Sequence, residues 1–283
     1  MGRIYGIFYN HAGDNAPGVV LVLKMIPYKI FSMFEFGPIH INMYGIMFAF
    51  GILAASLLAV KEAKKRNIDT EIIWDLILYL LIGIVVGARA FYVLFYWPEG
   101  MPLTLVGAAA IWNGGLAFFG GFLGALLAGY IFVRKKKLKF WLLADIFAVP
   151  LVVGHIFGRL GDYFTGGHPG RITSLPWGIY LNDAIRHPVI LYEILGLAII
   201  IIILLNMRKF KEQKQLFEGF LFSSYVILYS TQRMILDFFR IESTDPRYLG
   251  LTPTQYVVII LFFLAISFML FNIYKRKFHG QER

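Results

Sequence analysis

The chain has 283 residues, of which 58% are hydrophobic and only 16% charged, with a mean hydropathy of +0.67. It contains no cysteine, which excludes disulfides, zinc thiolates, iron–sulfur clusters and a cysteine nucleophile. The net charge of +10 would suit nucleic acid, but most basic residues gather in short loops between apolar runs, which argues against that partner.

The first 35 residues form an N-terminal segment of uncertain character. Its run APGVVLVLKMI (16–26) is apolar but too short to cross a bilayer, and no convincing small-residue cleavage site follows. We therefore expect an extracytoplasmic or interfacial segment rather than a signal peptide. An over-extended gene start is the alternative, with Met25 and Met33 as other possible starts.

Seven apolar runs follow, each long enough to cross a bilayer as a helix. They cover residues 42–60, 72–96, 104–133, 140–157, 188–207, 216–239 and 253–274. The fourth is interrupted by Asp145, Pro150 and His155. The pattern predicts an all-α polytopic membrane protein with about seven transmembrane helices. Residues 36–274 would form one transmembrane domain, and residues 275–283 a basic tail.

The basic residues follow the positive-inside rule. Of the 27 lysines and arginines, 17 lie after the first, third, fifth or seventh span. They are Lys61, Lys64, Lys65, Arg66, Arg134, Lys135, Lys136, Lys137, Lys139, Arg208, Lys209, Lys211, Lys214, Lys275, Arg276, Lys277 and Arg283. This predicts a multi-pass protein of the cell membrane, with its N-terminus outside and its C-terminus in the cytoplasm.

Beyond the N-terminal segment, every basic residue outside those loops is an arginine. Arg89, Arg159 and Arg233 lie in or at the end of the second, fourth and sixth spans, towards the outer face. Arginine binds phosphate or carboxylate through two hydrogen bonds and stays charged when desolvated. Asp162 and Asp237 follow Arg159 and Arg233 by three and four residues, so local ion pairs are an alternative. Three arginines at one depth favour an anionic ligand, such as a lipid phosphate.

Glycine is dense in two places. Gly120, Gly124 and Ala128 have the spacing of small residues that let helices pack closely, and packing is our interpretation of that face. In GRLGDYFTGGHPGR (158–171) the glycines accompany proline and polar residues, which indicates a broken helix. Broken backbone at membrane depth is tolerated only where protein buries it or where it lines a wet cavity. We therefore expect a polar cavity near the outer face.

Six motifs occur in order along the transmembrane part. They are FGPIHINMYG (36–45), GARAFYVLFYWPE (87–99), IWNGGLAFFGG (111–121), GRLGDYFTGGHPGR (158–171), RHPVILYE (186–193) and QRMILDFFR (232–240). With these motifs the chain resembles the bacterial prolipoprotein diacylglyceryl transferases. The resemblance implies an enzyme that moves the diacylglyceryl group of phosphatidylglycerol to the lipobox cysteine of a secreted preprotein, while glycerol phosphate leaves. This is the first step of lipoprotein maturation, and it implies no metal and no cofactor.

The resemblance also assigns roles to residues. Arg159 and Arg233 match the essential arginines of the family, Asp162 the Asn/Asp position of its signature, and Tyr44 the tyrosine of the first span. The predicted lipid-phosphate site consists of Arg89, Arg159, Arg233, Arg240 and the signature glycine Gly170. The predicted catalytic set consists of Arg159, Asp162, Arg233, Asp237, Tyr44 and His168. Asp237 stands where the family usually has glutamate.

Three motifs depart from the family pattern, at four positions in all. The motif Ser-Phe-His-Gly-Gly reads AFFGG here, so Phe119 replaces a histidine proposed to be catalytic. Thr165 and Gly167 replace an asparagine and a glutamate of the signature, and Ile190 replaces a glutamine. His168 is our first candidate for a replacement base.

Several side chains near these positions keep two interpretations. His155 is a weaker candidate base, and His187 belongs to the retained Arg-His-Pro motif. Tyr192 and Glu193 lie in a retained motif, where a structural role is at least as well supported as a catalytic one.

Two other functions remain open at this point. The lost His and Glu positions also fit a divergent relative with another lipid donor or acceptor, or a lipid-binding homologue without catalysis. A retinal protein is disfavoured because Lys275 begins the tail and no lysine lies inside the seventh span. A transporter would more often show internal repeats, and the sequence has none that we detect.

Overall fold

The computed structural model describes residues 26, 28–36, 39–96, 104–111, 114–242 and 246–279. Its elements are β1 (Met33–Phe36), β2 (Ile39–Asn42), α2 (Met43–Lys65), α3 (Thr70–Phe95), α4 (Leu105–Ala109), α5 (Phe118–Lys135), α6 (Phe140–Thr165), β3 (Ile179–Leu181), β4 (Ala184–Arg186), α7 (Val189–Lys214), α8 (Phe220–Leu236), the 3₁₀ helix η2 (Asp237–Phe239) and α9 (Pro253–His279). Most of the N-terminal segment predicted over residues 1–35 lies outside the described residues.

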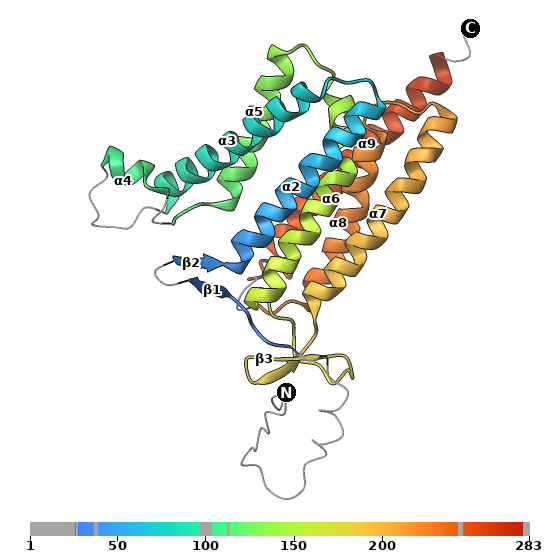
Figure 1. The fold of residues 1–283 in the computed structure, drawn as a ribbon. Coiled ribbons are helices and arrows are strands. Elements are labelled where there is room, and N and C mark those ends of the chain that lie inside the picture. The colour runs from blue at the N-terminus through green and yellow to red at the C-terminus, as the bar shows by residue number, and fades with distance from the viewer. Residues whose placement is uncertain are drawn as a thin grey trace, which may run out of the picture.

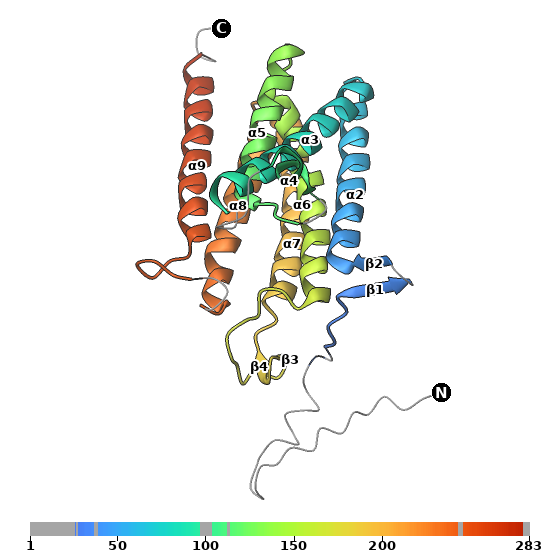
Figure 2. The same ribbon diagram turned by 90° about the vertical axis from the view of Figure 1, so that its left-hand side faces the viewer.

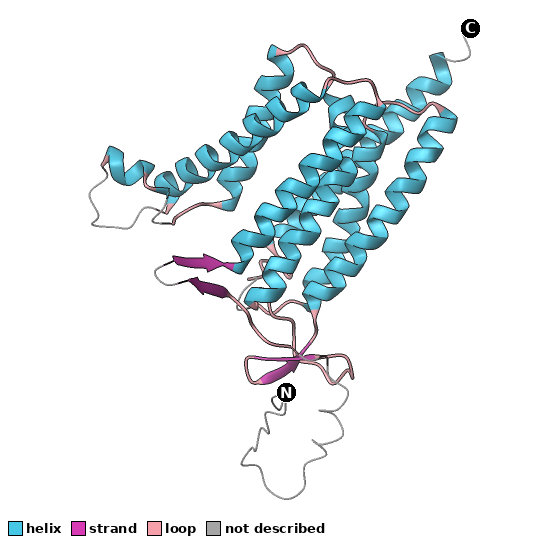
Figure 3. Cartoon of the chain, in the orientation of Figure 1, coloured by secondary structure: helices cyan, strands magenta, loops and turns pink. Residues whose placement is uncertain are grey.

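Long helices dominate the described part of the chain (Figure 3). Seven of them have 17 or more residues: α2, α3, α5, α6, α7, α8 and α9. Five of these, α2, α3, α6, α7 and α9, are both long and apolar enough to be identified as membrane spans by length and composition. The fold-class prediction of a mostly helical, polytopic membrane protein is confirmed. Two short antiparallel hairpins, β1–β2 and β3–β4, supplement the helices.

The basic loops lie together at one end of the molecule, opposite the two hairpins (Figure 1). There the apolar core joins α2, α3, α5 and α6 through Ala59, Ile73, Phe132 and Ile146, which are almost completely buried. Ion pairs such as Arg208 with Glu62, at 2.6 Å, link neighbouring helices. The loops that are rich in basic residues therefore lie at the same end of the molecule, as the sequence predicts.

Asp145 has a structural function at this basic end. Its carboxylate pairs with Lys211 of α7 and accepts hydrogen bonds from the backbone N–H groups of Gly219 and Phe222, both at 2.9 Å. It therefore caps the start of α8 from the neighbouring helix α6. A buried carboxylate with these partners does not interrupt its helix, so α6 runs on through Asp145 and Pro150.

Two predicted spans need correction. The span predicted over 104–133 is divided: α4 ends at Ala109 and α5 begins at Phe118, because Gly114 and Gly115 adopt positive φ angles of 79° and 74°. The span predicted over 140–157 is longer, since α6 continues to Thr165 and ends at Gly166, where φ is 72°. Arg159 and Asp162 consequently lie within a helix and not in a helix break.

The glycines within α6 lie at its contacts with α2 and do not break the helix. Gly154 lies against the backbone of Gly51 in α2, and a Cβ atom on Gly161 would be 3.0 Å from the ring of Tyr44. These glycines permit close packing of α6 on α2. The helix break predicted over residues 158–171 is wrong for residues 158–165, which are helical, and the helix ends only at Gly166.

Helices α3 and α5 form a tightly packed pair, as predicted from the small-residue spacing. Gly83 and Gly87 of α3 face Gly120 and Gly124 of α5 with their backbones in contact. Towards the end with the hairpins, this pair leans away from α2 (Figures 1 and 2).

We expect Gly124→Ala to lower the free energy of unfolding by about 2 kcal/mol, because the added methyl group would collide with the carbonyl oxygen of Gly83 and over-packing carries that order of cost. Gly45→Ala is the control, since a Cβ atom on Gly45 meets nothing within 4 Å. Thermal unfolding of the two variants in detergent measures the difference. Equal midpoints would contradict the close packing of α3 on α5.

Candidate active site

A cluster of charged side chains lies where α6, α7 and α8 meet. Its centre is Glu193 of α7, which is 4% exposed. One carboxylate oxygen, Oε2, lies 2.7 Å from Nε of Arg159 in α6. The other, Oε1, lies 2.8 Å from Nη1 of Arg233 in α8 and 2.6 Å from Nη2 of Arg240. A single carboxylate therefore joins three guanidinium groups from separate parts of the chain.

Two aspartates complete this ionic cluster, which we define as Arg159, Asp162, Glu193, Arg233, Asp237 and Arg240. Asp162 pairs with Arg159 at 2.7 Å, and Asp237 pairs with Arg233 at 2.9 Å. Both local pairs follow the spacings of three and four residues that the sequence shows. With three cations and three carboxylates the cluster is formally neutral, which limits the cost of keeping these charges at membrane depth.

Helix α9 supports the cluster through Asp237. The carboxylate of Asp237 is fully buried and accepts a hydrogen bond from the hydroxyl of Thr252 at 2.8 Å. Gln255, also fully buried, donates to the backbone carbonyl of Met234 at 3.0 Å. Arg247 donates to the carbonyl of Asp237 at 2.8 Å. The turn that carries Asp237 is therefore held from the start of α9.

Arg159 is the least buried of the three arginines, with 15% of its side chain exposed, compared with 7% for Arg233 and 1% for Arg240. Tyr44, at the first turn of α2, packs its ring on Gly161 of α6, and its side chain is 42% exposed. His155, one turn before Arg159, lies 3.4 Å from the guanidinium through its Nε2 atom. The open side of the cluster thus lies along α6.

Gly170 connects the loop that follows α6 to the cluster. It forms an isolated antiparallel bridge with Arg240, and Arg171 donates its backbone N–H to the carbonyl of Phe239 at 2.8 Å. A Cβ atom on Gly170 would collide with the carbonyl oxygen of His187. The contacts of this glycine are therefore with neighbouring backbone, and a direct role in lipid binding remains a prediction.

Arg89 does not join the other arginines. Its guanidinium donates to four backbone carbonyls: Gly107 at 2.7 Å, Ala108 at 2.8 Å, Gly114 at 2.5 Å and Gly115 at 3.0 Å. These bonds fasten α4 and the connection between α4 and α5 to α3. Arg159 and Arg233 converge on Glu193 together with Arg240, and the predicted role of Arg89 in lipid-phosphate binding stays a prediction.

His168 lies beyond the end of α6 with a φ of 47°, in the wall of a small cavity that it shares with Tyr28 and His187. Burial lowers the pKa of His187, so its imidazole is neutral at pH 7. Burial raises the pKa of Tyr28 to about 12, so its hydroxyl stays protonated and donates to the carbonyl of Tyr163 at 2.7 Å. Phe119, at the start of α5, is 50% exposed.

Glu193 is the centre of the ionic cluster, which the sequence alone did not indicate. Its position in Leu-Tyr-Glu was visible, but nothing local pairs it with an arginine, because its partners lie 34, 40 and 47 residues away. An isolated acid in an apolar helix is a signal in itself, since such a residue needs a cationic partner at membrane depth.

The fold and this cluster define a multi-pass membrane protein with three arginines held in its interior by three carboxylates. A family model described as prolipoprotein diacylglyceryl transferase matches residues 32–271. The chain belongs to this family.

Similar proteins named phosphatidylglycerol–prolipoprotein diacylglyceryl transferase occur in distant bacteria. The one from Pediococcus pentosaceus is 35% identical over 253 residues, which cover 84% of this chain and 88% of the relative. That from Finegoldia magna is 36% identical over 235 residues, covering 83% and 91%. That from Trichormus variabilis is 34% identical over 242 residues, covering 81% and 80%.

Proposed function

We propose that the chain transfers the diacylglyceryl group of phosphatidylglycerol to the lipobox cysteine of a prolipoprotein. The observation that carries this proposal is the convergence of Arg159, Arg233 and Arg240 on Glu193 at the ends of membrane helices. Membership of the family and the names of its relatives support it. The partners are phosphatidylglycerol and lipobox-containing preproteins. The N-terminus lies outside and the C-terminus in the cytoplasm, with the cluster towards the outer face.

The proposed reaction raises the negative charge on a phosphate. The cysteine sulfur forms a bond to the glycerol carbon of the diacylglyceryl group while the bond from that carbon to the phosphate oxygen breaks. The electron pair leaves with glycerol phosphate, and the thiol proton passes to a base. The donor phosphodiester carries one negative charge, whereas the departing monoester carries between 1.5 and 2 at pH 7, by analogy with a phosphorylated side chain, so roughly one charge develops. Fixed cations stabilise such a charge best in a site with little water.

We assign different roles to the three arginines of the cluster. Arg159 is the least buried and lies on the open side, so we assign it direct contact with the phosphate. Arg233 and Arg240 are paired with Glu193 and Asp237, and they hold the Glu193 carboxylate that fixes the guanidinium of Arg159. Asp162 orients Arg159 through their 2.7 Å ion pair. Tyr44 borders the same side of α6, and His168 remains our candidate for the base.

The test is a transfer assay with purified protein, phosphatidylglycerol and a lipobox peptide. Mass spectrometry should detect a diacylglyceryl thioether on the cysteine and nothing on a matched peptide in which serine replaces it. Absence of the thioether would overturn the proposed activity.

Phe119 supports a second candidate, a relative that binds phospholipid without transferring it, because a phenyl ring cannot take the thiol proton. We nevertheless expect measurable transfer by the unmodified chain. Phe119→His should raise the rate by about a hundredfold, the lower range for general acid–base catalysis, because it restores the histidine that the family motif has at this position.

Phe119→Leu is the matched control for this measurement and should not accelerate transfer. If the unmodified chain is inactive but binds phosphatidylglycerol, and Phe119→His restores transfer, the non-catalytic function is the correct one.

A further inference from the structure

A tight turn directly before α9 carries a leucine in an unfavourable backbone conformation. Tyr248 and Leu251 exchange two backbone hydrogen bonds, at 2.8 and 3.1 Å, so Leu249 and Gly250 form a two-residue turn. Both central residues have positive φ angles, 50° and 84°, as a type I′ turn requires. Asparagine or glycine suits the first of these positions, whereas the Cβ atom of a leucine is strained there.

The β3–β4 hairpin provides a comparison within the same molecule. Its two turn residues, Asn182 and Asp183, also have positive φ angles, 51° and 56°, and both are exposed polar residues. Among the described residues, seven other than glycine have a positive φ angle, and Leu249 is the one with an apolar side chain. That side chain is 99% exposed. Neither backbone preference nor burial within the protein therefore explains a leucine at this position.

The turn is fixed to the rest of the protein by hydrogen bonds. Tyr256 of α9 donates its hydroxyl to the backbone carbonyl of Tyr248 at 2.7 Å. Arg247, which precedes the turn, donates to the backbone carbonyl of Asp237 at 2.8 Å. The side chain of Tyr248 is itself 62% exposed. The turn thus presents two apolar or aromatic side chains, those of Tyr248 and Leu249, on a fixed support.

The turn lies close to the boundary of the hydrocarbon core. This core is about 30 Å thick, which a helix crosses in about 20 residues. Lys275 marks the basic end of α9, and about 20 residues before it the helix reaches Gln255, close to its start at Pro253. Figure 2 shows that the loop before α9 extends sideways from the bundle, at the level of that end of the helix. The turn therefore stays at the depth of the lipid headgroups.

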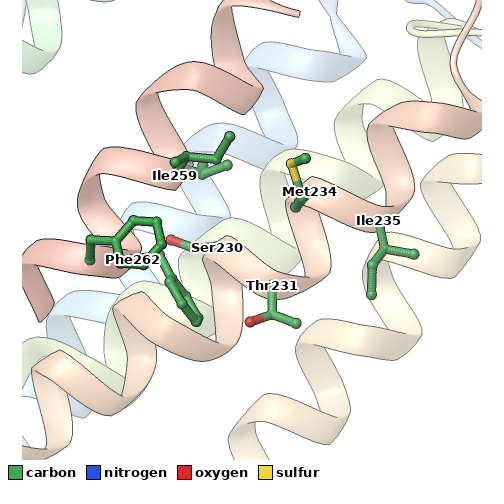
Figure 4. A pocket seen from close by; sticks show the side chains of 8 residues that line it. Ser230, Thr231, Met234, Ile235, Ile259 and Phe262 are labelled. Atoms are coloured by element: carbon green, nitrogen blue, oxygen red, sulfur yellow. The ribbon is translucent and has the colours of Figure 1, made fainter. Parts of the chain in front are cut away.

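The helix surfaces that adjoin the turn are apolar. Between its first residue and Lys275, α9 carries no charged side chain. Phe263 and Leu264 are 62% and 61% exposed. A groove of about 300 Å³ between α8 and α9 has a mostly apolar lining, which includes Ile259 and Phe262 (Figure 4). Exposed apolar surface on a membrane-spanning helix faces lipid, so α9 borders the bilayer from its basic end up to the turn.

We infer that Tyr248 and Leu249 insert into the lipid leaflet beside α9 and anchor this turn to the bilayer surface. The partner is a phospholipid surface. The leucine side chain leaves water for the upper part of the acyl chains, which offsets the strain of its backbone, and tyrosine is favoured at the membrane interface. Because Arg247 links the turn to Asp237, the anchor also holds this end of the ionic cluster at a fixed depth. The inference does not depend on the transfer reaction.

The absence of cysteine allows a single introduced cysteine to carry a nitroxide label. Full-length Leu249→Cys is labelled and reconstituted in phosphatidylcholine vesicles. Electron paramagnetic resonance then compares collisions of the label with lipid-soluble oxygen and with a water-soluble nickel chelate. Leu264→Cys is the reference for a lipid-facing position, and Asp183→Cys, in the polar turn, is the reference for water. The ratio of oxygen to nickel collisions at position 249 should approach that at 264 and exceed that at 183 severalfold.

A second pair of variants tests the leucine itself. With the label at Tyr248→Cys, the additional substitution Leu249→Asn should increase collisions with nickel, because asparagine suits the turn but not the acyl chains. Leu249→Asn alone should not lower the midpoint of thermal unfolding in detergent, since a side chain that is 99% exposed packs on nothing that could be lost.

These measurements also distinguish the other possible partners of the turn. A collision ratio at position 249 equal to that at 183 would overturn the inference, as would nickel access at 248 that Leu249→Asn leaves unchanged. Dipolar broadening between labels would indicate that a second copy of the chain covers the turn. Exclusion of nickel that occurs only after a lipobox peptide is added would assign the turn to the preprotein. Either of these two results would also reject a lipid anchor.

Discussion

Replacing Glu193 with glutamine should unfold or strongly destabilise the protein. The substitution keeps the size of the side chain but removes the one carboxylate that contacts Arg159, Arg233 and Arg240. Three guanidiniums would then share only Asp162 and Asp237. Because removing one partner of a buried ion pair leaves an uncompensated charge, we expect the free energy of unfolding to fall by roughly 3–5 kcal/mol. Thermal unfolding in detergent and the yield of folded protein measure this loss.

Two further variants test whether the loss of stability is specific to Glu193 or follows from removing any acidic side chain. Glu193→Asp keeps the charge and should be less damaging, because the side chain is only one methylene group shorter in its reach to the arginines. Glu242→Gln is the control for an exposed acid: its side chain is 65% exposed and lies 3.3 Å from Arg171. Exposed pairs contribute about 0–1 kcal/mol, so its unfolding should change little. Similar losses in Glu193→Gln and Glu242→Gln would show that Glu193 does not organise the cluster.

The ion pairs between residues three or four apart could be predicted from the sequence, whereas the central position of Glu193 could not. The Arg159–Asp162 and Arg233–Asp237 pairs each lie on one helical stretch, so residue spacing alone permits them. The position of Glu193 between three arginines depends on how α6, α7 and α8 pack. The partners of Arg89 could not be predicted from the sequence either. They are backbone carbonyls in a stretch whose sequence predicts one continuous apolar helix.

The mostly helical, polytopic character of the chain was predictable, and the helix ends were less so. The thickness of the bilayer sets the length of the apolar runs, and membrane insertion sets which loops are basic. Both constraints shape the composition of long stretches, so they can be recognised in the sequence. A glycine can either end a helix or permit close packing, and the choice depends on the neighbouring helix. Gly161 packs against Tyr44, whereas Gly166, five residues later, adopts the left-handed conformation that ends α6.

Arg159→Ala should lower kcat/KM for transfer by about 10²–10³, the loss typical when one group that stabilises developing charge is removed. Its effect on folding should be smaller than that of Glu193→Gln, because Glu193 keeps Arg233 and Arg240 as partners. Arg159→Lys should retain part of the activity, since lysine supplies the charge but not the planar fork that binds phosphate through two hydrogen bonds. The transfer assay, paired with photolabelling by phosphatidylglycerol, measures catalysis and lipid binding separately.

Arg208→Ala provides the matched control for this prediction. Arg208 also forms a short ion pair with a glutamate of another helix, at 2.6 Å from Glu62, but it lies at the basic end of the molecule. Losing an interhelical arginine there should leave kcat/KM close to that of the unmodified chain. If Arg159→Ala retains full lipid labelling, Arg159 does not hold the phosphate. If it instead loses labelling and transfer together while Arg208→Ala loses neither, the arginine at the open side of the cluster binds the lipid on which the reaction depends.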